Sequence, residues 1–160
     1  MSITQANLHP MKKPEIFLDS SALIAGIVSA QGAARVLLLL AENEKIELWV
    51  SEQVIAEVER NLARKAPRAL PVAREMILRA NIQILHDPKP ADVRSHMDWI
   101  NHAADVPILV AAANAQVDFL VTLDVRHFID DPVVAQRSGL RIGTPGDALI
   151  WVREWFVRNK

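Results

Sequence analysis

Four acidic residues that lie far apart in the sequence are the groups best suited to chemistry in this chain: Asp19, Glu57, Asp105 and Asp124. Asp19 and Asp124 each come directly after an apolar run. Glu57 lies about two turns into a predicted helix, and Asp105 opens another helix. Ionised carboxylates that share one pocket repel each other unless a cation is present. The pattern therefore predicts a site for hard divalent ions such as Mg²⁺ or Mn²⁺, which prefer oxygen ligands.

Each acid also has a purely structural interpretation when it is considered alone. Asp19 and Asp105 fit helix N-caps, Asp105 being followed by a proline two residues later. Asp124 fits a turn, and Glu57 fits a solvated residue paired with a nearby arginine. The joint placement of the four favours a shared site. Two neighbouring acids compete with Glu57 for its place, Glu52 and Glu59.

The elements that must position these acids alternate between strands and helices. Short apolar runs predict strands at 16–18, 47–50, 82–85, 117–122 and 140–142. Helices are predicted over 20–29, 33–42, 52–65, 70–80 and 91–101, and from residues 105, 131 and 144 onward. This alternation predicts an α/β sandwich around a mostly parallel sheet. In such sheets the site lies at the carboxyl ends of the strands, where the connections reverse direction, and Asp19 and Asp124 fall there.

Length and composition limit the classes of protein that the chain can belong to. Its 160 residues, of which 51% are hydrophobic, are enough for one domain, predicted over 14–160 after a loose N-terminal arm at 1–13. A net charge of −1 argues against binding nucleic acid by charge alone. The absence of cysteine excludes thiol catalysis and Cys-ligated zinc. The arm is no secretory signal, and no apolar run approaches the roughly 20 residues that span a bilayer, so we expect no membrane and a cytoplasmic location.

Four motifs follow one another in a recognisable order. They are Asp19-Ser20-Ser21-x-Leu23 after a hydrophobic residue, Ser51 to Glu57, Asp105-x-x-Ile-x-x-Ala111-Ala112, and Val121-Thr-Leu-Asp124-x-x-x-Phe128. Through them, over residues 16–142, the chain resembles the PIN-domain nuclease family, which includes VapC-toxin-like ribonucleases. The resemblance implies a three-layer α/β/α sandwich with about five parallel strands. It also implies one or two Mg²⁺ or Mn²⁺ ions and RNA hydrolysis by a metal-activated water.

The resemblance assigns roles to individual positions. Asp19, Glu57, Asp105 and Asp124 would be the catalytic, metal-binding acids. Ser20 would help to hold the site or a water molecule, and Thr122 would orient Asp124. Basic residues near these acids are candidates for contacts with RNA phosphates: Arg60, Arg64, Lys65, Arg68, Arg126 and His127. The family also suggests an antitoxin protein as a partner and a homodimer. Trp151, Trp155 and Phe156 at helical spacing near the C-terminus are more often core than interface, although so aromatic a helix could also support a dimer.

Other functions remain open at this point. A degenerate PIN domain would be a non-catalytic RNA- or protein-binding module, but it would lack one of the acids. An aspartate-dependent phosphatase would also use Asp19, yet Ser21 stands where its second acid is expected. A receiver domain would need paired acids that are absent, and no glycine-rich nucleotide loop is present. A zinc site on Asp98, His102 and Asp105 would need one continuous helix, whereas we expect a new helix to begin at Asp105.

Overall fold

The structure is a computed structural model that describes residues 11–160. Its centre is a 5-stranded, all-parallel sheet with strand order β3-β2-β1-β4-β5. The strands are β1 (Glu15–Leu18), β2 (Glu47–Ser51), β3 (Gln83–Leu85), β4 (Phe119–Val121) and β5 (Ile142–Gly143). Most of the N-terminal arm predicted for 1–13 lies outside the described residues.

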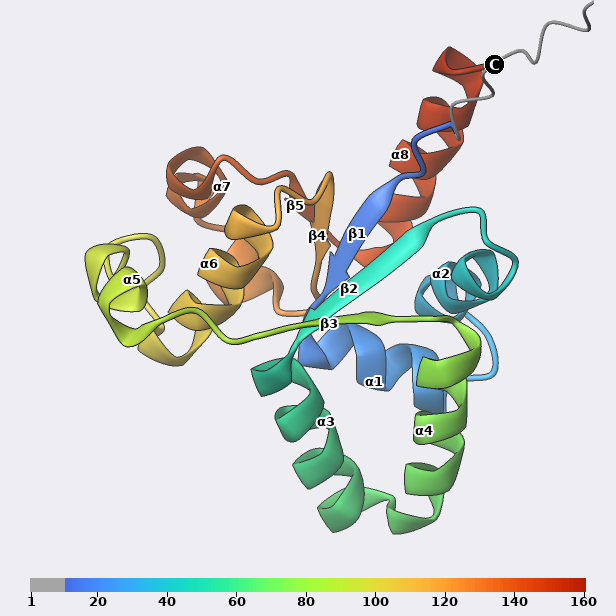
Figure 1. Cartoon of the computed structure of the whole chain (residues 1–160). Coiled ribbons are helices and arrows are strands. Elements are labelled where there is room, and N and C mark those ends of the chain that lie inside the picture. The colour runs from blue at the N-terminus through green and yellow to red at the C-terminus, as the bar shows by residue number, and fades with distance from the viewer. Residues whose placement is uncertain (1–10) are drawn as a thin grey trace, which may run out of the picture.

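Helices cover both faces of the sheet. They are α1 (Ser20–Val28), α2 (Ala33–Glu42), α3 (Glu52–Lys65), α4 (Leu70–Arg79), α5 (Pro90–Ser95), α6 (Val106–Asn114), α7 (Pro132–Ser138) and α8 (Pro145–Arg158). Helices α1 to α4 and α8 lie on one side, whereas α5, α6 and α7 gather on the other (Figure 1). The predicted three-layer α/β/α sandwich is confirmed.

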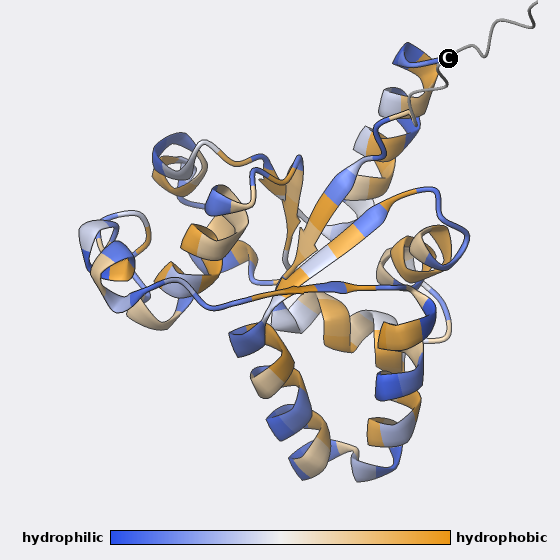
Figure 2. Cartoon of the chain, viewed as in Figure 1, coloured by the Kyte–Doolittle hydropathy of each residue, from blue (hydrophilic) through white to orange (hydrophobic). Residues whose placement is uncertain are grey.

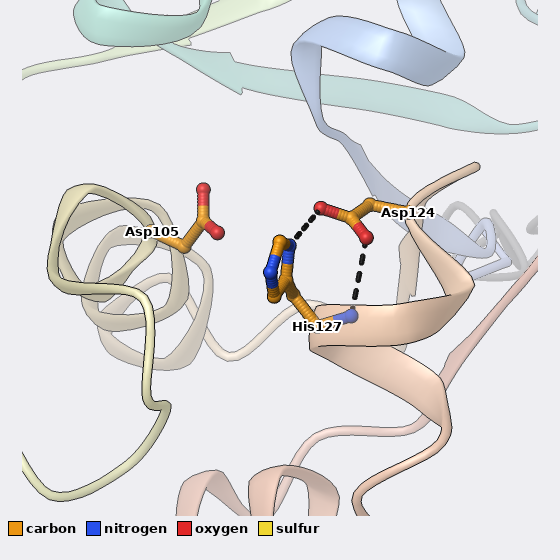
Figure 3. A group of neighbouring side chains, drawn as sticks. All are labelled: Asp105, Asp124 and His127. Atoms are coloured by element: carbon orange, nitrogen blue, oxygen red, sulfur yellow. Dashed lines mark hydrogen bonds and ion pairs between the residues drawn. The ribbon is translucent and has the colours of Figure 1, made fainter.

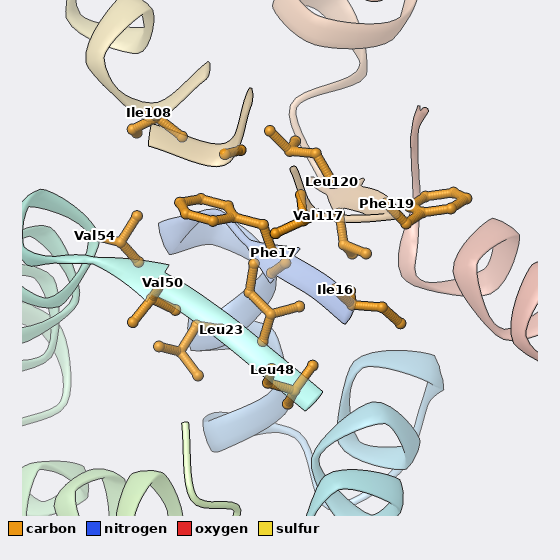
Figure 4. Packing of buried hydrophobic residues seen from close by; sticks show 14 of the residues in the cluster. Ile16, Phe17, Leu23, Leu48, Val50, Val54, Ile108, Val117, Phe119 and Leu120 are labelled. Carbon is orange, nitrogen blue, oxygen red and sulfur yellow. The ribbon is translucent and has the colours of Figure 1, made fainter. Parts of the chain in front are cut away.

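The core lies where the central strands meet the inner faces of the helices. Ile16, Phe17 and Leu18 of β1 are at most 2% exposed, and Leu120 of β4 is fully buried. Figure 2 shows hydrophobic residues along the strands and hydrophilic ones on the outer faces of the helices. Figure 4 shows Phe17 and Leu120 among the apolar side chains that fill the space between the layers. A strand buried on both faces explains the uninterrupted apolar run before Asp19.

The connections reverse direction between β1 and β4. From β1 the chain moves to β2 and then to β3 at one edge, and it later returns to β4 on the opposite side of β1. Strand β1 pairs with both neighbours, with Phe17 beside Trp49 and Leu18 beside Val121. The carboxyl ends of β1 and β4 therefore form the switch point at which α/β sheets bind ligands.

One predicted helix is shorter than expected. The helix predicted over 91–101 ends at Ser95. The Nδ1 atom of His96 lies 2.7 Å from the carbonyl oxygen of Asp92, and this contact occupies the acceptor that the next helical amide would use. The backbone amide of His96 instead donates to the carbonyl of Val93, at 3.0 Å. The continuous helix required by the zinc interpretation is therefore absent from this segment.

The predicted N-terminal caps of two helices are present in the structure. Ser51 caps α3 by accepting the amide of Val54, and Thr144 and Asp147 form a capping box at α8. The last strand begins at Ile142, two residues later than predicted. Among residues 11–160 no single helix has the length and apolar character to span a membrane, and α1 and α2 meet those criteria only as a pair bent by 86°.

Candidate metal centre

Asp19 is the most buried acid of the site, with 4% of its surface exposed. It follows β1 and caps α1, because its Oδ1 atom accepts the amide of Ala22 at 2.9 Å and the hydroxyl of Ser21 at 2.7 Å. Its Oδ2 atom accepts a hydrogen bond from the hydroxyl of Thr122. Burial raises the pKa of Asp19 despite these hydrogen bonds, and the charge of Asp105 raises it further. The capping interpretation was correct but does not account for the buried charge.

Two hydroxyl groups join the ends of β1 and β4. Thr122, which is fully buried, accepts the backbone amide of Asp124 at 2.9 Å while it donates to Asp19. Ser21 accepts the amide of Leu123 at 3.0 Å while it donates to Asp19. Thr122, which was expected to orient Asp124, therefore contacts both Asp19 and Asp124. The sequence assigned a supporting role to Ser20, whereas the hydroxyl that contacts Asp19 belongs to Ser21.

Asp105 stands at the junction of η2 (Ala103–Asp105) and α6. It occupies the N-cap position, yet its side chain makes no capping hydrogen bond. Its Oδ2 atom instead lies 2.9 Å from Nδ1 of His102. Burial raises the pKa of Asp105, the charge of Asp124 adds to this effect, and His102 partly offsets it. The helix-capping interpretation therefore does not explain this acid.

Asp124 follows β4 and begins η3 (Val125–Ile129), a wide π-helical turn. Its Oδ1 atom accepts the backbone amide of His127 at 3.1 Å, and its Oδ2 atom lies 2.7 Å from Nδ1 of the same residue. Burial disfavours the charged form of Asp124, but these hydrogen bonds and the nearby imidazoles outweigh burial and lower its pKa. These contacts therefore favour the ionised form of Asp124.

Asp105, Asp124 and His127 form a compact group of possible ligands. Each offers one ligand atom, and these atoms lie within 4.8 Å of one another. Figure 3 shows the imidazole of His127 between the two carboxyl groups. The two carboxylates are ligands that suit Mg²⁺ and Mn²⁺, so they fit the predicted metal, and the imidazole adds a nitrogen donor that the prediction did not include.

Glu57 is not a member of this group, but Gln53 links it to the segment that carries Asp105. The Nε2 atom of Gln53 donates to Oε1 of Glu57 and to the carbonyl oxygen of Ala104, both at 2.9 Å. The two alternative candidates on α3, Glu52 and Glu59, make other contacts. Glu52 contacts His86 and Glu59 pairs with Arg74, at 2.8 and 3.6 Å. Glu57 is thus the acid of α3 that is connected to the segment carrying Asp105.

The predicted RNA-contacting residues fall into two groups. Most of them are exposed and form no ion pair within residues 11–160: Arg60, Arg64, Lys65, Arg68 and Arg126. His127 differs, because its ring contacts Asp124 instead of extending from the surface. His127 also stacks on His102 with ring centroids 5.0 Å apart, so a second imidazole lies beside the one in the zinc interpretation. Asp98 lies away from the group and pairs with Arg137.

Comparison with known proteins identifies a family for most of this fold. A family model described as "PIN domain" matches residues 15–126, which include all four acids. No curated protein matches the chain in sequence.

Solved structures resemble the chain in fold. They include VapBC2 from Rickettsia felis bound to a DNA fragment from its promoter, with a TM-score of 0.59 at 18% identity over 81% of this chain and 98% of that one. PAE2754 from Pyrobaculum aerophilum matches with a TM-score of 0.60 at 19% identity, over 88% of this chain and 96% of that one. DNA-bound VapBC from Salmonella typhimurium matches with a TM-score of 0.60 at 18% identity, over 82% of this chain and 98% of that one. At such identities the likeness establishes the fold alone.

Proposed function

This chain belongs to the PIN domain family, and from that premise we propose that it is an endoribonuclease that depends on Mg²⁺ or Mn²⁺. One observation carries the proposal. Asp19, Asp105 and Asp124 come from segments far apart in the sequence and meet at the switch point of the sheet, where burial raises the pKa of two of them. Acids placed at a cost to their own ionisation are typical of a cation site.

The residues of the site would divide the work among them. A bound divalent ion supplies an activated water and stabilises the charge that develops on a phosphodiester during hydrolysis. Asp105 and Asp124 would hold the cation, and Glu57 would complete the acidic ring from α3. Asp19, which hydrogen bonds from Ser21 and Thr122 hold in place, would provide negative potential at the centre of the metal site.

Two alternatives fit the structure less well. A phosphatase would need Asp19 as a nucleophile, but both of its carboxylate oxygens accept hydrogen bonds and only 4% of the residue is exposed. A non-catalytic binding module would have no reason to keep Asp19, Asp105 and Asp124 so close that the charge of one acid raises the pKa of the next. We therefore favour hydrolysis over binding alone.

The partners that we propose follow from the family and from the fold. Two of the similar structures are VapBC assemblies, which supports the toxin of a toxin–antitoxin pair as the role of this chain, with a separate antitoxin protein as its partner. We further propose a homodimer in the cytoplasm. RNA would approach along the exposed basic residues of α3 and beyond, namely Arg60, Arg64, Lys65, Arg68 and Arg126.

Cleavage of a panel of labelled single-stranded and structured RNAs tests this function. The purified protein should cut at least one of them with Mn²⁺ or Mg²⁺, and EDTA should stop the reaction. Re-addition of the ion should restore cleavage. Cleavage that persists in EDTA would contradict metal dependence, and RNA binding without cleavage under any metal condition would favour the non-catalytic module.

A further inference from the structure

The side chain of His127 is held in one orientation by Asp124. The backbone amide of His127 donates to Oδ1 of Asp124, and its Nδ1 atom lies 2.7 Å from Oδ2 of the same carboxylate. The imidazole also stacks on the ring of His102, at an interplanar angle of 17°. A ring fixed on its edge by a carboxylate and on its face by a second ring cannot turn outward without losing both contacts.

This arrangement determines which nitrogen atom of His127 is free to bind a ligand. An ionised carboxylate only accepts hydrogen bonds, so Nδ1 of His127 donates to Asp124. A neutral imidazole that donates through Nδ1 carries its lone pair on Nε2. Figure 3 shows this ring between the carboxyl groups of Asp105 and Asp124. The figure also shows the second ring nitrogen of His127 on the side that faces Asp105, so the lone pair of Nε2 lies beside the small group that His127 forms with the two acids.

Histidines that bind metals share this pattern of contacts. Such a histidine donates its second ring N–H to a carboxylate or carbonyl oxygen, which fixes the tautomer and makes the coordinating nitrogen more basic. Asp124 provides that carboxylate for His127. His102 forms a comparable contact with Asp105, but 53% of its side chain is exposed against 39% for His127. His127 is thus the inner histidine of the stacked pair.

We infer that Nε2 of His127 is a nitrogen ligand of the metal site, and that this ligand makes the site prefer Mn²⁺ to Mg²⁺. The inference rests on the proposed function, because it concerns the same cation. Mg²⁺ favours oxygen ligands and retains its waters. Mn²⁺ also suits carboxylates, but it is a transition metal that binds sites with nitrogen donors, although more weakly than Fe²⁺ or Zn²⁺ does, so an imidazole ligand favours Mn²⁺ over Mg²⁺. An all-carboxylate site would not discriminate in this way.

The substitution His127→Asn separates the role of Nδ1 from the role of Nε2. The asparagine amide reaches the position of Nδ1 and can still donate to Asp124, but nothing replaces Nε2. The matched control is His102→Asn, which changes the other member of the stacked pair. Circular dichroism and thermal unfolding of both variants would establish that they fold.

Two measurements on the Mn²⁺-loaded protein test the inference without an activity assay. Pulsed electron paramagnetic resonance detects coupling between bound Mn²⁺ and a coordinating ¹⁴N nucleus. The wild-type protein and His102→Asn should show this coupling, and His127→Asn should lose it. Calorimetric titration with MnCl₂ and MgCl₂ should show the ratio of Mn²⁺ to Mg²⁺ affinity falling about tenfold or more in His127→Asn alone.

The possible failures are distinguishable. If Mn²⁺ binds the wild-type protein without ¹⁴N coupling, or if the coupling survives in His127→Asn, then His127 only orients Asp124 and the inference is wrong while the ribonuclease proposal stands. If neither Mn²⁺ nor Mg²⁺ binds the wild-type protein, the metal site itself is wrong and both proposals fail.

Discussion

The hydroxyl group of Thr122 donates a hydrogen bond to the carboxylate of Asp19, a residue 103 positions earlier in the chain. The same oxygen atom accepts the backbone amide of Asp124, at 2.9 Å. One buried side chain therefore fixes both acids that end the two central strands. The spacing of these acids is a property of the sheet register, in which Leu18 lies beside Val121.

Removal of the Thr122 hydroxyl should affect both stability and activity. Thr122→Val keeps the shape of the side chain but leaves the amide of Asp124 without this acceptor and Asp19 without one of its donors. We expect the free energy of unfolding, measured in urea, to fall by about 1–3 kcal/mol. RNA cleavage should fall as well. Thr122→Ser, which keeps the hydroxyl, should retain more of both, and equal losses in the two variants would show that the hydroxyl is not responsible.

The raised pKa of Asp19 predicts how stability depends on pH. Because folding raises this pKa above its ordinary value of 3.8, the folded state holds the proton more tightly than the unfolded chain does. The contribution of Asp19 to the stability of the metal-free protein must then fall as pH rises from about 4 through the raised pKa. Asp105 contributes in the same direction, whereas Asp124, with a lowered pKa, contributes in the opposite one.

Asp19→Asn removes this buried charge. In EDTA at pH 7 the variant should unfold at the same or a higher denaturant concentration than the wild-type protein, although it should not cleave RNA. The advantage should shrink as the pH is lowered toward 4, where Asp19 regains its proton. A variant that is clearly less stable at pH 7 would show that the hydrogen bonds of Asp19 outweigh the penalty for burying its charge.

Gln53 is predicted to position Glu57. Gln53→Met preserves the length of the side chain but removes the donor to Glu57 and to the carbonyl of Ala104. Loss of such a supporting contact lowers metal affinity or activity by about 10- to 100-fold. The metal concentration for half-maximal cleavage and the maximal rate should reveal the effect. Gln83→Met, which removes a donor to Asn81 instead, should behave as the wild-type protein, and an unchanged Gln53→Met would remove Glu57 from the site.

Arg60 and Arg64 are predicted to contact RNA phosphates. The double substitution of both by alanine should weaken the binding of a labelled RNA to the inactive Asp19→Asn protein. If each arginine neutralises one phosphate, the slope of log affinity against log salt should become shallower by about 1.4. Substitution of Arg153 and Arg158, two exposed residues on α8, gives the same change in net charge. An equal effect of both pairs would indicate non-specific attraction.

The main features of the fold were predictable because local pattern and tertiary environment agree. The apolar run of β1 suits a strand that is buried on both faces, and Ser51 and Thr144 are side chains that cap helices. The predicted length of the helix that begins at Pro90 is too great, because the composition of the segment favours helix. The contact between the His96 ring and a backbone carbonyl, which accompanies the end of the helix, depends on a side-chain rotamer that composition does not reveal.

The site was predictable in its acids and less so in the groups around them. Asp19 and Asp124 follow strands, and strand ends in a parallel sheet converge by geometry. The bond from Thr122 to Asp19 required the register of β1 against β4, which the sequence does not encode locally. The sequence predicts that His127 contacts RNA phosphates. Its position three residues after Asp124 nevertheless places its backbone amide within reach of that carboxylate, and this spacing is the sequence feature that indicates the contact between the two residues.

Cleavage of RNA by Asp19→Asn and Asp105→Asn tests most directly whether the dispersed acids act as one metal centre. The matched control is Asp98→Asn, an exposed acid that pairs with Arg137 outside the site. We predict that both site variants keep the circular dichroism spectrum of the wild-type protein and lose Mn²⁺- or Mg²⁺-dependent cleavage, while the control keeps it. Undiminished cleavage by both folded site variants would contradict the proposed metal centre.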